Sequence, residues 1–191
     1  MILLRNRFGG AEDKRALENF VMLLWDAGFY LGHSVRSLRE CFTEAREDVV
    51  TFTNLMESRW LAGNPELFEK LRVRTDAQTW WPGQAFFEAK YQEQQQRHQR
   101  FEDTAYNLEP NIKEGPGGLR DIQMIGWVAK RHFGAQTLHG LVEHGLLTEP
   151  EYWDLHKGQS FLWWVRFALH LLAGRSEDRL LFDYQRRIAR R

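Results

Sequence analysis

The chain has 191 residues, and its 26 basic and 26 acidic side chains cancel at pH 7. Because a net charge of zero gives no overall attraction to polyanions, we expect neither a nucleic acid nor a membrane as a partner, and no apolar run reaches the length of a membrane span. Hydrophobic residues make up 43% of the chain, which is enough for the core of one domain or of two small ones.

The cysteine content indicates the compartment. Cys41 is the single cysteine, which excludes an internal disulfide and is typical of a reducing environment, so we expect a cytoplasmic protein. No adjacent base or metal pattern supports a nucleophile, so we expect Cys41 to pack on an amphipathic helix.

The first 75 residues alternate between strand and helix signals. Ser37 and Glu40 form an S-x-x-E capping box, Asn64 is a cap followed by a first-turn proline, and Gly32 is expected to end the first helix. The predicted elements are a strand at 2–4, a helix at 11–30, a strand at 33–38, a helix to about 47, a strand at 49–53, an undecided segment at 55–61 and a helix from 64 to about 72.

From residue 76 onward the signals are almost wholly helical. The predicted helices are 84–104, 119–133, about 138–144 and 149–173, followed by a docked turn or short segment at 179–183. Their buried stripes are expected at Ile122, Ile125, Val128 and Ala129, and at Phe161, Leu162, Trp164, Val165, Ala168 and Leu172. The polar stretch 93–100 is typical of a solvent-exposed helix face. The predicted fold class is therefore α+β and mostly helical.

The stretch from Tyr106 to Ile122, Tyr-Asn-Leu-Glu-Pro-Asn-Ile-Lys-Glu-Gly-Pro-Gly-Gly-Leu-Arg-Asp-Ile, carries the clearest functional signal. A Pro–Gly–Gly turn opens into a helix, whose N-terminus offers unpaired N–H groups and the positive end of the macrodipole. Lys113 and Arg120 add positive charge, so the stretch suits a phosphate-bearing ligand. Glycines at such turns commonly serve the backbone conformation alone, and nearby carboxylates reduce the positive potential, so both interpretations stay open.

A second candidate pair is Glu57 and Arg59, two residues apart in Thr53–Gly63. In an extended segment the two side chains would share a face and could point into a cleft, where the carboxylate could help hold Mg²⁺ beside nucleotide phosphates. A structural Glu–Arg ion pair explains the same spacing and is favoured on spacing alone. The seven histidines show no metal-ligand spacing, and no P-loop or dinucleotide-binding fingerprint occurs.

Several strings resemble one family, in the same order and over essentially the whole chain. They are Gly-His-Ser-Val-Arg-Ser-Leu from Gly32, Thr-Asn-Leu-Met-Glu-Ser-Arg-Trp-Leu-Ala-Gly from Thr53, Gln-Gln-Arg-His-Gln-Arg from Gln95, the run from Tyr106 to Ile122, Trp-Val-Ala-Lys-Arg-His-Phe-Gly from Trp127, Arg-Phe-Ala-Leu-His from Arg166 and Arg-Leu-Leu-Phe-Asp from Arg179. The chain thus resembles the bacterial PII-protein uridylyltransferase/uridylyl-removing enzymes, which regulate nitrogen metabolism through the glutamine synthetase cascade.

The resemblance implies a nucleotidyltransferase of the DNA polymerase β type. Residues 1–75 would be the C-terminal part of that domain, with a remnant of its sheet, and residues 76–191 an all-α domain that completes the nucleotide cleft. The family transfers UMP from UTP to a tyrosine of the PII signal protein with Mg²⁺, and carries HD and ACT domains as well. The resemblance places those domains and the Asp-x-Asp metal pair outside these 191 residues, so we expect a fragment of a multidomain enzyme that is inactive alone.

The resemblance also implies roles for single residues. Glu57 is the expected metal ligand and, with Arg59, the expected catalytic residue, while Asp48 is the alternative ligand. Asp121 is expected to orient Arg120 or to bind the sugar or base. The expected nucleotide-binding residues are Asn107, Lys113, Gly117, Gly118, Arg120 and Asp121.

Two alternative functions stay open. One is a non-catalytic module that binds PII or docks neighbouring domains. The other is a fragment of the sister enzyme, glutamine synthetase adenylyltransferase, in which a related Gly-Gly-Ile-Arg-Glu pattern occurs. The Asn-Leu-Glu-Pro and Gly-His-Ser-Val-Arg strings favour the uridylyltransferase.

Overall fold

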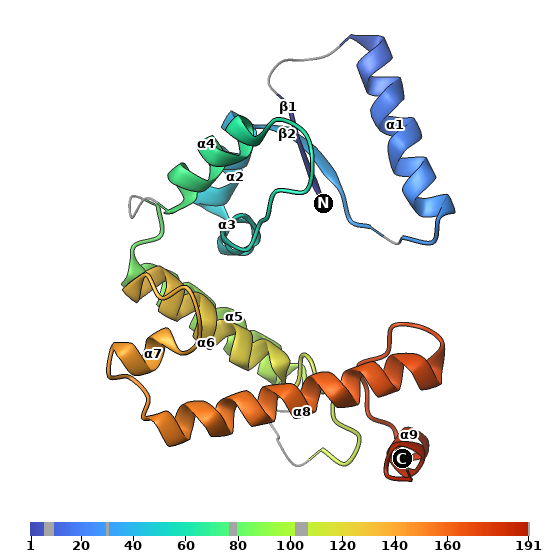
Figure 1. Ribbon diagram of the computed structural model, residues 1–191, viewed down its shortest axis with the longest axis vertical. Helices are drawn as coiled ribbons and strands as arrows, with labels where there is room; N and C mark the ends of the chain where they lie inside the picture. The colour runs from blue at the N-terminus through green and yellow to red at the C-terminus, as the bar shows by residue number, and fades with distance from the viewer. Residues whose placement is uncertain (6–9, 30, 77–79, 102–106, 191) are drawn as a thin grey trace. The chain divides into compact units, whose positions relative to one another are not determined.

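The computed structural model describes residues 1–5, 10–29, 31–76, 80–101 and 107–190. The chain divides into two compact units, unit 1 from Met1 to Trp80 and unit 2 from Trp81 to Arg191 (Figure 1). Helices dominate and one small sheet is present, so the predicted α+β, mostly helical class is confirmed.

Unit 1 contains a β-α-β arrangement. Strand β1 (Ile2–Arg5) pairs in parallel with β2 (Ser34–Ser37), and helix α1 (Ala11–Asp26) lies between them in the sequence. Parallel strands need a crossover connection, usually a helix, and α1 serves as one. The predicted strands at 2–4 and 33–38 are therefore confirmed, with observed bounds of Ile2–Arg5 and Ser34–Ser37.

Helix α1 ends earlier than predicted. Gly28 adopts a left-handed conformation (φ 84°), and its N–H donates to the carbonyl of Trp25 at 2.9 Å. Glycine reaches positive φ without steric penalty, which makes it a frequent residue just beyond a helix C-terminus. The helix thus ends at Asp26, and Gly28 rather than Gly32 follows its end, while residue 30 lies outside the described part of the chain.

Three further helices of unit 1 are α2 (Leu38–Glu47), α3 (Val49–Met56) and α4 (Pro65–Asp76). Helix α2 begins with the predicted capping box, in which Ser37 and Glu40 each bond to the other's backbone N–H. Helix α4 begins after Asn64, whose Oδ1 accepts the N–H of Glu66 at 2.8 Å, and it runs past the predicted end at Arg72. Local cap signals therefore located both helix starts.

The predicted strand at 49–53 is wrong, because these residues belong to helix α3. Asp48 caps this helix by accepting the N–H groups of Val50 and Thr51 at 3.2 and 2.7 Å. Burial of one face against α2 and α4 outweighs the β propensity of the β-branched residues. The buried residues of α3 are Phe52, Thr53, Leu55 and Met56. The undecided segment 55–61 is helical only in its first two residues.

Cys41 lies on α2 and is completely buried, so its predicted packing role is confirmed. Burial raises the pKa of the Cys41 thiol. A buried thiol with a raised pKa forms little thiolate and is a poor nucleophile.

Unit 2 consists of helices α5 (Gly83–Gln99), α6 (Leu119–Phe133), α7 (Gly140–Glu143), α8 (Glu149–Ala173) and α9 (Phe182–Ile188). Helices α5 and α6 lie side by side, and α8 contacts both α6 and α9 (Figure 1). The predicted bounds of α6 and α8 are confirmed, as is the cap of α8 by Thr148. Helix α5 is shorter than the predicted 84–104: residues 100–101 follow it outside the helix, and residues 102–104 lie outside the described ranges.

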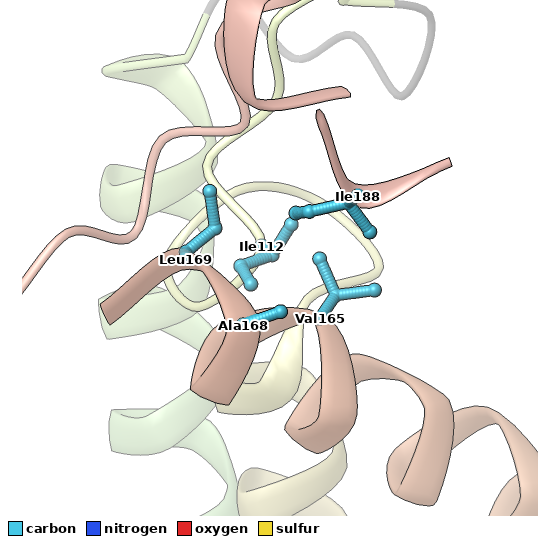
Figure 2. Packing of buried hydrophobic residues seen from close by; sticks show 5 residues of the cluster. All are labelled: Ile112, Val165, Ala168, Leu169 and Ile188. Carbon is cyan, nitrogen blue, oxygen red and sulfur yellow. The ribbon is translucent and has the colours of Figure 1, made fainter. Parts of the chain in front are cut away.

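One core of unit 2 joins a loop to two helices (Figure 2). Ile112, from the loop before α6, packs with Val165, Ala168 and Leu169 of α8 and with Ile188 of α9. Because Ile112 is only 5% exposed, the loop that carries it is anchored in the hydrophobic core.

The predicted buried stripes are partly right. Among the expected positions, Ile122, Ala129, Val165 and Ala168 are buried, whereas the side chains of Ile125, Phe161 and Trp164 are exposed. Helix α8 touches its neighbours over a narrower face than its many apolar residues suggest. None of the helices in the described part of the chain has the length and apolar character needed to span a bilayer.

Replacing Asp48 tests whether its carboxylate stabilises the start of α3. We expect Asp48→Ala to lower the free energy of unfolding by about 1 kcal/mol, because two backbone N–H groups lose their acceptor. Asp48→Ser, which keeps a capping oxygen, should lose less. Urea denaturation followed by far-UV circular dichroism measures both, and an alanine variant as stable as the parent chain would contradict the capping role.

Candidate functional site

The loop formed by residues 107–118 is a compact, internally bonded structure. The Asn111 side chain accepts the N–H groups of Lys113 and Glu114 at 3.1 and 2.8 Å. The N–H of Ile112 donates to the carbonyl of Asp178 at 2.9 Å, which ties the loop to the segment before α9. Residue 106, the first of the string that carries the clearest functional signal, lies outside the described residues.

The backbone amides around the start of α6 are already bonded within the chain. The N–H of Gly117 donates to Asp121 Oδ2 at 2.8 Å, that of Gly118 to the Gly115 carbonyl at 2.9 Å, that of Leu119 to the Ile112 carbonyl at 3.0 Å and that of Arg120 to the Lys113 carbonyl at 2.9 Å. A helix N-terminus attracts an anion through N–H groups that lack a partner. The expectation that these N–H groups are unpaired is therefore wrong.

The backbone conformation and the close packing of the turn require glycine at positions 117 and 118. Gly117 adopts φ 74°, and a Cβ atom on Gly118 would lie 2.9 Å from each of three carbonyl oxygens. Side chains at either position would strain the turn. A nucleotide-binding role for Gly117 and Gly118 stays a prediction, and the structure gives each of them a role in shaping the loop.

Asp121 is the centre of a largely buried polar network. Its Oδ1 accepts hydrogen bonds from Arg97 Nη2 at 2.6 Å and Gln94 Nε2 at 2.9 Å, and His98 Nε2 lies 3.1 Å from both carboxylate oxygens. Arg97 also donates through Nη1 to the Glu114 carbonyl at 2.7 Å. Asp121 and Arg97 thus connect α5, α6 and the 107–118 loop.

The polar stretch 93–100 is only partly a solvent-exposed face: Gln96, Gln99 and Arg100 are exposed, but Arg97 is buried. Arg97 is only 3% exposed, and it points its charge at Asp121 rather than at water. Burial alone would raise the pKa of the Asp121 carboxyl, but the hydrogen bonds from Gln94 and Arg97 outweigh burial and hold that pKa below its ordinary value.

Lys113 and Arg120, both predicted to bind the nucleotide, meet at one carboxylate. Lys113 Nζ lies 3.3 Å and Arg120 Nη2 3.2 Å from the same oxygen, Glu114 Oε1. Arg120 Nη1 donates to Gln123 Oε1 at 2.9 Å, and its guanidinium lies 5.5 Å from the centre of the Trp127 ring. Arg120 is therefore oriented by Glu114, Gln123 and Trp127, and the predicted orientation by Asp121 is not what these contacts show.

A second group of charged side chains, centred on Asp178, contacts the loop through Lys113, and the sequence alone did not reveal it. Asp178 lies 2.7 Å from Arg166 Nε, 3.5 Å from His170 Nε2 and 3.9 Å from Lys113 Nζ. Arg166, His170 and Arg97 all fall within the strings that carry the family resemblance, and that is the one signal in the sequence that points to them.

Asn107, also predicted to bind the nucleotide, is exposed at the start of the loop. Its Oδ1 accepts the N–H of Glu109 at 3.0 Å, which is an Asx turn. Glu109 in turn accepts the N–H of Phe182 at 2.9 Å. Asn107 therefore helps to shape the end of the loop that bonds to the start of α9.

Unit 1 contains a separate hollow of about 1030 Å³, and the predicted pair Glu57 and Arg59 both line it. Glu57 follows the last turn of α3 with φ −90° and ψ 0°, so the two residues do not share a face through an extended backbone as predicted. Apolar side chains from β1, α1, α4 and the segment 60–62 form much of the rest of its lining, together with polar groups that include His33 and Arg36.

Glu57 suits a cation better than Asp48 does. Among the described residues that line the hollow, Glu57 is the one carboxylate, and Mg²⁺ is commonly held by one or two carboxylates together with substrate phosphates. Asp48 does not line the hollow and has both oxygens bonded to backbone N–H groups. Within the described ranges, no three His, Cys, Asp or Glu side chains are grouped to hold a metal ion.

Comparison with known proteins decides the family. A family model described as GlnD PII-uridylyltransferase matches residues 85–191, more than half of the chain. The chain belongs to this family. No solved structure matches the chain.

Relatives named bifunctional uridylyltransferase/uridylyl-removing enzyme match nearly the whole chain. The relative from Methylococcus capsulatus is 52% identical over 189 residues, which is 99% of this chain and 22% of that protein. Those from Azotobacter vinelandii and Hydrogenovibrio crunogenus are 56% and 54% identical over 92% and 99% of this chain, or 20% and 21% of their own lengths. The chain thus spans about a fifth of the relatives it matches, and the resemblance seen in the sequence is confirmed.

The contribution of the buried ion pair between Asp121 and Arg97 to stability can be tested directly. We expect Asp121→Asn to lower the free energy of unfolding by about 3 kcal/mol, because Arg97 would keep a buried charge without its carboxylate. The matched control is Asp183→Asn, which breaks an exposed pair with Arg186 and should change stability by less than about 0.5 kcal/mol. Chemical denaturation measures both variants, and an equal loss of stability in Asp121→Asn and Asp183→Asn would contradict the central role of Asp121.

The same variant should also change the acid stability profile. Because the pKa of Asp121 is lowered in the folded state, the unfolded chain binds this proton more tightly. Its stabilisation is complete above the ordinary aspartate pKa of about 3.9 and is lost as the pH falls from there through the lower folded pKa. The difference in stability between the parent chain and Asp121→Asn should shrink over that interval.

Proposed function

We propose that this chain is part of an enzyme that transfers UMP from UTP to a tyrosine of the PII signal protein in the cytoplasm. The observation that carries the proposal is the 52–56% identity, over 92–99% of the chain, to enzymes named uridylyltransferase/uridylyl-removing. Those names favour uridylyl transfer over the adenylyl transfer of the sister enzyme.

In this proposal the side chains of Lys113 and Arg120 bind the phosphates of UTP. Both cations are about 30% exposed and converge on one point, so a phosphate oxygen at that point would contact both. The neighbouring amides cannot take this role, because they are bonded within the loop. Gly117, Gly118 and Asp121 act by holding the two cations in place, and Asn107 by shaping the start of the loop.

We propose Glu57 as a carboxylate ligand of Mg²⁺. A Mg²⁺ ion held there would neutralise negative charge on a bound phosphate group and polarise its phosphorus. Arg59 lines the same hollow and would contribute positive charge toward a phosphate. An exposed carboxylate beside an arginine in a hollow whose lining is otherwise in large part apolar supports this assignment.

The exposed apolar residues of α8 favour a second candidate function, docking of PII or of a neighbouring domain. The side chains concerned are Trp153, Phe161, Trp163, Trp164, Phe167 and Leu171. Patches of this kind often mark interaction surfaces. A chain that binds PII with the same affinity in the presence and absence of UTP would support docking rather than nucleotide binding.

A chimeric enzyme tests the proposed activity. The 191 residues would replace the matching segment of the Methylococcus capsulatus relative, and transfer of labelled UMP from UTP to PII would be measured. We expect the chimera to be active, and the double variant Lys113→Ala/Arg120→Ala to lower kcat/KM by about a hundredfold, because two charged contacts to phosphate are lost.

The matched control is the double variant Lys157→Ala/Arg175→Ala, which removes the same charges from exposed positions of unit 2. It should leave kcat/KM within about twofold of the chimera, as expected for weakly paired surface charges. An inactive chimera that folds normally, or equal losses in the two double variants, would contradict the proposal.

A further inference from the structure

Glu114 holds an unusual position between the two proposed phosphate-binding cations. Elsewhere in unit 2, Arg97 pairs with Asp121, and Arg166 pairs with Asp178, which also lies 3.9 Å from Lys113 Nζ. Lys113 and Arg120 share a single oxygen, Glu114 Oε1. Three cations, Lys113, Arg120 and Arg166, are thus paired with two carboxylates, Glu114 and Asp178, which leaves a local excess of positive charge.

The side chain of Glu114 is not needed to hold the loop. Its backbone N–H donates to Asn111 Oδ1 at 2.8 Å, and its carbonyl accepts from Arg97 Nη1 at 2.7 Å. Neither bond involves the carboxylate. A change confined to the end of this side chain therefore leaves the backbone anchors of the loop in place.

The two cations also keep other contacts if the Glu114 charge is removed. Arg120 retains its hydrogen bond to Gln123 and its place beside the Trp127 ring. Lys113 retains Asp178, 3.9 Å away. Glu114 is thus one of several groups that position the two cations, and Gln123, Trp127 and Asp178 remain in contact with them when its charge is removed.

We propose that Glu114 is a built-in competitor of the anionic ligand: its carboxylate occupies the point between Lys113 and Arg120 that a phosphate oxygen takes on binding. This inference rests on the proposed function, since it assigns the same two cations to phosphate. Carboxylate and phosphate oxygens are equivalent acceptors for ammonium and guanidinium groups, so one replaces the other. The Glu114 side chain is 30% exposed and lies next to water into which it can turn.

The competition has a consequence for specificity. Displacing Glu114 costs the binding free energy of its two ion pairs, and an anion with several charges offsets that cost better than one with few charges. Glu114 therefore lowers the apparent affinity of every anion that must displace it by the same factor. A ligand of low intrinsic affinity, such as inorganic phosphate, then no longer binds appreciably, whereas a triphosphate with more charges still does. It acts as a residue that sets which anions bind, without touching the reacting atoms.

Calorimetric titration of the 191-residue chain with inorganic tripolyphosphate, and then with UTP, tests this inference. We expect Glu114→Gln to bind tripolyphosphate roughly fivefold more tightly than the parent chain, with the gain reduced at high salt. Thermal unfolding of both chains verifies that the fold is kept. The matched control is Glu143→Gln, the same change at an exposed position of unit 2, which should leave the affinity unchanged.

The results that would overturn this inference differ from the result that would overturn the proposed function. Unchanged or weaker binding by Glu114→Gln, including no binding by either chain, would overturn the inference. So would a gain that persists in Glu114→Gln/Lys113→Ala/Arg120→Ala, because the gain must depend on the two cations. If the gain is found and is lost in that triple variant while the chimera shows no UMP transfer, the competition stands and the proposed function fails.

Discussion

The buried ion pair between Arg97 and Asp121 is the interaction on which the candidate site of unit 2 depends. Arg97 is almost completely buried, and a buried guanidinium is tolerated where acceptors take up its charge. Here both Nη groups have acceptors, whereas Nε has none among the described residues. Its two Nη groups bond to the Asp121 carboxylate and to the Glu114 carbonyl, so one side chain fixes both the start of α6 and the loop before it. The positions of Lys113 and Arg120 follow from this arrangement, because each is next to an atom that Arg97 or Asp121 holds.

The loop is held from a second side by its hydrophobic anchor. Ile112 packs in the core with α8 and α9 (Figure 2). Its N–H donates to the carbonyl of Asp178, whose carboxylate pairs with Arg166. The backbone from Asn111 to Leu119 is therefore held both by hydrogen bonds and by the packing of Ile112 in the hydrophobic core. A scaffold of this kind presents charged side chains with little backbone freedom left to lose on binding, which favours tight and oriented contacts with a ligand.

Local signals locate much of the fold, and long-range pairing explains most of the errors. The capping boxes at Ser37 and Thr148 involve residues three apart, so the sequence alone is enough to place the helices they begin. The partner of Arg97 is 24 residues away in Asp121, so residues 93–100 resemble a solvated face when the sequence is considered alone. Helix α3 has the β-branched residues typical of a strand, and its packing against α2 and α4 is not visible in the sequence.

The bonded amides at the start of α6 change which chemistry can recognise an anion there. Asp121 lies in the first turn of α6 and accepts the N–H of Gly117, so its charge opposes the positive end of the helix dipole where an anion would otherwise be attracted. Under the proposed function, the phosphates are recognised by the side chains of Lys113 and Arg120, whose attraction for an anion is screened by salt. Glycines that look suited to ligand contact serve the turn instead, because Gly118 is packed against three carbonyl oxygens. The string from Tyr106 to Ile122 correctly indicates the family. From residue 107 onward it forms the bonded loop that carries Lys113 and Arg120, so a phosphate site there would rely on those two side chains rather than on the bonded amides.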